Sequence, residues 1–164
     1  MANPDYIDAM TEGLGDLLGI EGLRLNAEGR AGLNVGPLEV DLHLDPEAPE
    51  IFWISTVLGE MTDRKATPRF LLEVNFLSWL HDTMTISLLE NQNGNADGDG
   101  YQAVGFTAIP TPMLTIEVLS LTFEKFCQAA VAIHSRLEAE DYSPLDETLY
   151  ETRPKLPVGA VVQV

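Results

Sequence analysis

Between residues 116 and 137 the apolar side chains of this chain form one long stripe. They recur at alternating spacings of three and four residues: Ile116, Leu119, Phe123, Phe126, Ala130, Ile133 and Leu137. Such spacing keeps side chains on one face of an α-helix for about six turns. The flanking positions lack the paired Glu and Lys residues of a coiled coil, so the stripe predicts a long helix packed on a core.

Two more helices are predicted from similar openings. Asn3-Pro4, Thr67-Pro68 and Thr111-Pro112 each place a capping residue before a proline at the first helical position. We therefore predict helices over about 4–18 and about 68–80, and a third that starts at the last of these pairs. The second helix is apolar on two faces, which requires two surfaces to pack against and indicates a subunit interface besides the core.

Elsewhere the apolar period is two residues. Apolar side chains alternate with polar ones or Gly over 31–35, 38–44, 84–88 and 104–108, and 51–58 is apolar on both faces. Alternation is typical of strands with one buried and one solvated face. The predicted fold class is α+β, an antiparallel twisted sheet with three helices in the order α-β-β-β-α-β-β-α.

The length of 164 residues suits one domain with a sizeable core, which we expect over residues 1–139. Residues 140–164 show no sustained periodicity, and we predict an extended or disordered C-terminal tail there. The tail ends in VGAVVQV, which is apolar enough to add as a strand to a sheet edge, and this alternative stays open.

Charge and cysteine content restrict the partners and the compartment. The chain has 26 acidic and 9 basic residues, a net charge of -17, which argues against nucleic acid and anionic membranes as partners. Acidity instead favours solubility and a basic or amphipathic protein partner. The single cysteine, Cys127, cannot form an internal disulfide, and its neighbours suggest a buried structural thiol. With no signal peptide and no apolar run of about 20 residues, we expect a cytoplasmic protein.

No motif indicates catalysis, a metal or a cofactor. The three histidines lie on different predicted elements, and neither GxSxG nor a phosphate-binding loop occurs. Asn93-x-Asn95-x-Asp97-Gly98 is similar to the first half of an EF-hand loop, but the twelfth position is Val104 instead of Glu. The segments on either side of residues 91–100 have strand-like patterns, which further favours a hairpin connection at these residues. We expect no enzyme and no cofactor, and leave open an active site of scattered carboxylates.

The order of elements, together with three apolar motifs, resembles the class I type III secretion chaperones of the CesT/Tir-chaperone family. The motifs are LGDLLGIEGLRLNAEGRAGLNV, FLLEVNF with Asn75 at the family's Asn position, and LTIEVLSLTFEKFCQAAVAIHSRLE. The likeness spans about Tyr6 to Glu138. Two departures are the long 91–100 connection and the tail.

The resemblance implies a homodimer in the bacterial cytoplasm that binds the N-terminal segment of secreted effector proteins. It would keep that segment non-globular and competent for type III secretion, contact the secretion apparatus and contribute to virulence. The alternative is an acidic adaptor domain of similar fold with no tie to secretion.

Residue sets for both kinds of contact follow from this hypothesis. We expect client contacts among apolar strand residues, although for each one the core is the favoured interpretation: Leu33, Val35, Leu38, Val40, Leu42, Phe52 and Trp53. We expect dimer contacts on the second helix and the strand after it: Phe76, Leu77, Trp79, Leu80, Met84 and Ile86.

Overall fold

The computed structural model describes residues 4–45, 47–61, 66–81, 83–90, 101–143 and 162–163. The elements follow in the order α1 (Pro4–Leu18), β1 (Arg30–Val35), β2 (Leu38–Leu44), β3 (Ile51–Met61), α2 (Thr67–His81), β4 (Thr85–Glu90), β5 (Tyr101–Pro110), a 3-10 turn η1 (Thr111–Met113), α3 (Ile116–Glu138) and β6 (Val162–Gln163). The predicted order of helices and strands is confirmed as far as α3. The 91–100 connection lies outside the described residues, whereas its flanks are strands, as predicted.

The long helix begins later than its proline signal predicts. Thr111 and Pro112 belong to η1, and α3 starts at Ile116 behind the N-cap Thr115, whose side chain accepts a hydrogen bond from the N–H of Val118. A hydroxyl that satisfies an otherwise unpaired N–H is a stronger helix start than proline alone. The prediction of the start at Thr111-Pro112 was therefore wrong by one short turn.

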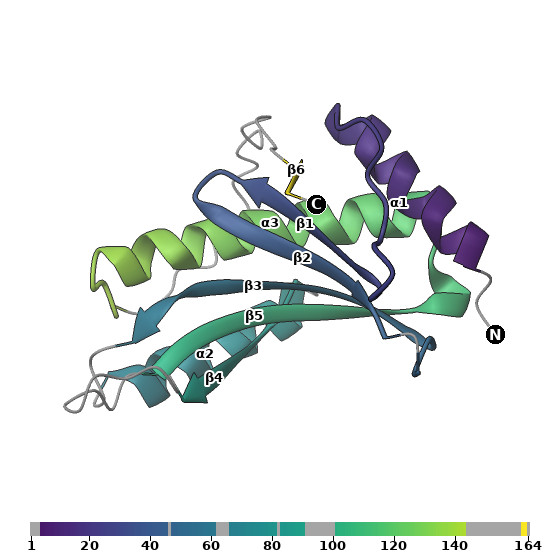
Figure 1. The fold of residues 1–164 in the computed structure, drawn as a ribbon. Coiled ribbons are helices and arrows are strands. Elements are labelled where there is room, and N and C mark those ends of the chain that lie inside the picture. Colours follow the sequence, from purple (N-terminus) through teal and green to yellow (C-terminus); the bar gives the residue numbers. More distant parts are fainter. Residues whose placement is uncertain are drawn as a thin grey trace.

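All strands join one antiparallel sheet in the order β4-β5-β3-β2-β1-β6. The helix α3 packs against β3 and β5, α1 packs against α3, and α2 packs against β4. In Figure 1 α3 runs behind the strands and α2 lies behind β4 and β5. The strand residues that point toward these helices are buried, and with the apolar stripe of α3 they form the core.

A β-bulge interrupts the β3–β5 ladder between Val57 and Gly59. The carbonyl of Leu58 lies 2.8 Å from Nδ1 of His134 on α3. Because a carbonyl can only accept, Nδ1 must carry the proton that it donates. His134 thus ties α3 to the bulge.

We predict that Gly59→Ala destabilises the fold by about 1–3 kcal/mol. Gly59 has φ of +140°, a conformation that L side chains rarely adopt, while an added Cβ would meet Leu137 at an ordinary 3.6 Å. Backbone strain is therefore the cause. Urea unfolding measures the loss, and Ser55→Ala on the same strand should change stability by less than about 0.5 kcal/mol. Equal stability of wild type and Gly59→Ala would contradict the expected strain.

Candidate protein-binding surface

One face of the sheet carries no helix in the described part of the chain, and we call it the open face. Alternate residues of β1, β2, β3 and β5 are buried on the helix side, so the residues between them point to the open face. The pairing register lines them up in rows across the strands: Arg30, His43, Trp53 and Ala108 in one, Gly32, Asp41, Ser55, Phe106 and Thr85 in the next, and Val57, Val104 and Ser87 in the third.

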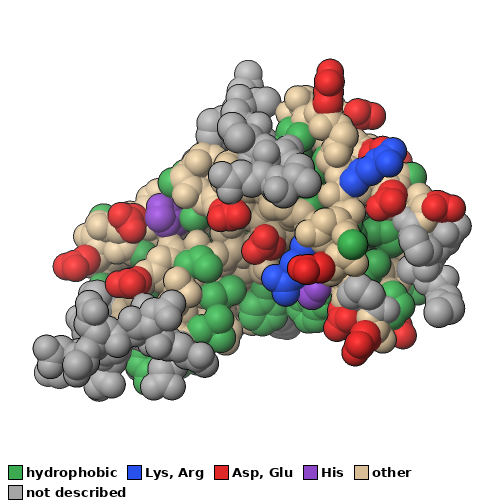
Figure 2. Space-filling model, in the orientation of Figure 1, with side chains coloured by type: hydrophobic (Ala, Val, Ile, Leu, Met, Phe, Trp, Pro, Cys, Tyr) green, Lys and Arg blue, Asp and Glu red, His purple; other side chains and the backbone are tan. Residues whose placement is uncertain are grey.

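The open face is apolar over β3 and β5 and acidic beside them. The rings of Trp53 and Phe106 lie 6.1 Å apart between centroids, and Val57 is 46% exposed. Figure 2 shows hydrophobic side chains across the middle of this face, with acidic side chains above them. Exposed apolar surface with a polar margin is typical of sites that bind other proteins.

A hollow of about 250 Å³ lies between β2 and β3, lined both by open-face residues and by His134 of α3. The β2–β3 pairing ends at Val40 and Thr56, and the hollow lies beyond that point. It is lined by Pro37, Leu38, Glu39, Asp41, Val57, Gly59 and His134. Apolar lining residues together with the carboxylates of Glu39 and Asp41 can accept a long side chain with a basic end.

The predicted client contacts separate into two groups. Trp53 lies half-buried on the open face. The other six are core residues on the helix side of the sheet, each exposed by less than a tenth: Leu33, Val35, Leu38, Val40, Leu42 and Phe52. Leu38 also lines the hollow, whereas the remaining five offer little surface to a client, so we expect client contact mainly at Trp53 and its neighbours. Val57, Val104 and Phe106 were not among the contacts expected from the sequence. The apolar residues on both faces of the strand 51–58 were a signal that its second face also contacts another surface.

The helix α2 carries a second apolar surface. Phe76 is 61% exposed, and Leu72, one turn earlier, is 73% exposed. Of the other predicted dimer contacts, Leu77, Met84 and Ile86 are buried in the core. The side chains of Trp79 and Leu80 lie outside the described residues. Leu72 and Phe76 therefore define what we call the α2 face.

Asn75 lies beside the α2 face and fastens α2 to β4. Its Oδ1 accepts a hydrogen bond of 2.7 Å from the N–H of Ile86, and its Nδ2 donates one of 3.1 Å to the carbonyl of Ile86. The side-chain amide thus pairs with both backbone groups of one strand residue, as a neighbouring strand would. Asn75 is the residue that matches the Asn of the secretion-chaperone motif in the sequence analysis.

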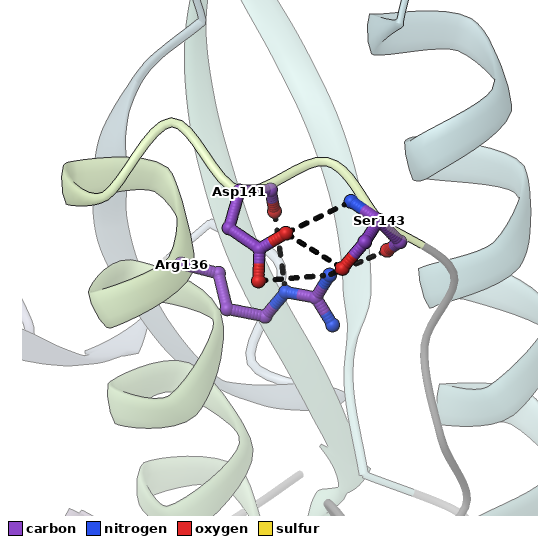
Figure 3. A network of polar contacts seen from close by, with 3 residues as sticks. All are labelled: Arg136, Asp141 and Ser143. Carbon is purple, nitrogen blue, oxygen red and sulfur yellow. Dashed lines mark hydrogen bonds and ion pairs between the residues drawn. The ribbon is translucent and has the colours of Figure 1, made fainter.

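Figure 3 shows a polar cluster that fixes the end of α3. Arg136 donates from Nε to the carbonyl of Asp141 (3.2 Å) and from Nη2 to both oxygens of Ser143. Its guanidinium lies 5.7 Å from the ring centre of Phe70, which in turn packs edge-on against Tyr142. The pKa of the Asp141 carboxyl is lowered because the Ser143 hydroxyl and N–H donate to it, with Arg136 nearby. The tail therefore leaves the domain from a fixed turn.

The described residues contain no cluster of three or more His, Cys, Asp or Glu side chains that could hold a metal ion. Cys127 is buried, and burial raises the pKa of its thiol, which keeps it protonated and unreactive. No helix in the same part of the chain is both long and apolar enough to cross a membrane.

The sequence matches no profile of a known protein family and no curated protein. Solved structures do match. They include the chaperone–effector complex of HopA1 and SchA, with a TM-score of 0.63 and 13% identity over 82% of this chain and 99% of that chain. Another is the Yersinia pestis type III secretion chaperone SycH in complex with a fragment of YscM2, with a TM-score of 0.56 and 16% identity over 77% of this chain and 98% of that chain.

This chain has the class I type III secretion chaperone fold. ExsC in the ExsC–ExsE complex shares it, with a TM-score of 0.63 and 18% identity over 84% of this chain and 97% of that chain. Because the sequence identity to each of these structures is below a fifth, the similarity is one of fold. The predicted resemblance and fold class are confirmed, and the chaperone fold here presents the open face and the α2 face as separate apolar surfaces.

Proposed function

We propose that this protein is a type III secretion chaperone that binds the N-terminal segment of secreted effectors in the bacterial cytoplasm. The observation that carries the proposal is the shared fold with SchA and SycH, which were solved in complexes with partner proteins. The chaperone would hold its client non-globular until secretion and would catalyse no reaction itself. The acidic-adaptor alternative has no observation of its own in its favour.

The open face supplies contacts of the kind such a client needs. An extended segment loses conformational entropy when it binds, so it requires a long contact surface with anchoring side chains. Trp53, Val57 and Phe106 form an apolar surface for such anchors. The hollow beside Val57 can take one side chain, and Glu39 and Asp41 at its edge favour a basic one.

The homodimer belongs to the same proposal. The α2 face places Leu72 and Phe76 in solvent in the single chain, which an isologous contact with a second copy would bury. Contacts with the secretion apparatus would use surfaces that the client and the dimer leave accessible. The acidic surface suits basic segments of either kind of partner.

Co-expression with effectors encoded near this protein's gene tests the proposal. A tagged chain should copurify with an effector, and limited proteolysis should show protection of the effector's N-terminal segment. Val57→Glu, on the open face, should lower the recovered effector at least about tenfold because it places a charge where apolar contact is needed.

Leu121→Glu is the matched control, since Leu121 is 55% exposed on α3, away from the sheet. It should retain the wild-type yield of effector. If no secreted protein copurifies, and deletion of the gene impairs no secretion, the chaperone function is refuted. Equal loss in both variants would argue against the open face as the client site.

A further inference from the structure

The two edges of the sheet differ in their capacity to accept another strand. At the β4 edge, both backbone groups of Ile86 are hydrogen-bonded to the side chain of Asn75. At the other edge, β1 has the sequence RAGLNV, without Lys or Pro, and its ladder with β2 runs unbroken from Arg30 to Val35. Apart from the charged Arg30 at its start, it lacks the proline and the bulge that often prevent strand addition. The β1 edge is therefore the strand-accepting edge of this domain.

The chain's own C-terminal strand occupies that edge. β6 pairs antiparallel with β1, with Gly32 opposite Gln163 and Leu33 opposite Val162. Figure 1 shows β6 beside β1, at the opposite side of the sheet from β4. Residues 156–164 carry no charged side chain, so the strongly acidic domain does not repel them.

The chain is long enough to reach this edge from the end of α3. The turn at Arg136, Asp141 and Ser143 fixes where the tail starts. Residues 144–161 can extend over about 60 Å, at roughly 3.3 Å per residue. That exceeds the length of α3, which at 1.5 Å per residue is about 35 Å. The tail can therefore close on its own β1 without help from a second copy.

We propose that β6 is an internal competitor that occupies the β1 edge until an extended client displaces it. The inference rests on the proposed function and adds a mode of regulation to it. Among the described residues, the pairs between β6 and the strand Arg30–Val35 are those at Gly32 and Leu33. A client segment that paired along the whole strand would form more ladder hydrogen bonds than the two described pairs of β6, so it can replace β6, while weaker, shorter segments are rejected.

The first test needs no effector. Val162→Pro combined with Gln163→Pro, in the full chain, removes two backbone N–H groups and should release β6. Glu151→Pro with Thr152→Pro is the matched control, with two prolines in the tail but outside β6. Amide hydrogen exchange of residues 30–35 should be faster in the first variant only. Equal exchange in both variants and wild type would overturn the pairing.

Competition is measured with a fluorescein-labelled peptide of residues 156–164. If β6 occupies the edge in about nine molecules of ten, the released variant should bind the peptide about tenfold more tightly than the control variant. Equal binding by both variants would overturn the inference.

A copurifying effector separates this inference from the proposed function. If the effector binds the released variant more tightly than wild type, both are supported. If it binds both with equal affinity, the competitor role is overturned while the chaperone function stands. If no effector binds either variant but peptide binding and exchange change as expected, the chaperone function fails and β6 remains an occupant of the edge.

Discussion

Replacement of Leu72 and Phe76 together by glutamate is expected to convert the protein from the proposed homodimer to a monomer. Both side chains are more than half exposed in the single chain and lie one turn apart on α2. In an isologous dimer each substitution acts twice, so the double variant would place four carboxylates in one apolar contact. Size-exclusion chromatography with light scattering measures the change as a halved mass.

Leu121→Glu serves as the control for an added charge on an exposed apolar site, because Leu121 lies on α3. It should leave the mass of the dimer unchanged. A charge at Ile86 is a poor test, since that residue is 4% exposed and its replacement would unfold the core. A double variant that kept the dimer mass would exclude the α2 face as the interface.

Asn75→Ala is expected to destabilise the domain by about 2–4 kcal/mol. The substitution removes two hydrogen bonds at once and leaves the N–H and the carbonyl of Ile86 without the partners that now pair with them. Because α2 packs on β4, loosening of this contact should also expose β4 to exchange. Urea unfolding at one fixed protein concentration measures the loss, since the proposed dimer would make stability depend on concentration.

Gln128→Ala is the matched control for loss of a side-chain amide. Gln128 donates to Glu124 on the exposed side of α3, and its loss should change stability by less than about 0.5 kcal/mol. Hydrogen exchange should be faster in β4 for Asn75→Ala and unchanged for Gln128→Ala. If Asn75→Ala unfolded at the wild-type urea concentration, the bonds to Ile86 would contribute nothing to stability.

The sequence by itself determined the elements and their order, because periodicity is a local property of the chain. The three-four spacing from Ile116 to Leu137 predicted α3, and the period of two predicted β1 and β2 almost to the residue. A helix or strand pattern reports which side of an element is apolar. It also led to the fold class, since few arrangements bury that many one-sided elements.

Only the tertiary structure decided which apolar surface is buried and which is exposed. Leu42 and Trp53 were equal candidates for client contact by sequence, yet Leu42 faces the helices and Trp53 faces the open side. Each strand has two faces, and the sequence pattern does not say which of them the helices cover. Likewise, the tail end VGAVVQV was compatible with disorder or with a strand. Its pairing with β1 depends on a free edge built from residues more than a hundred positions away, and no local pattern contains that information.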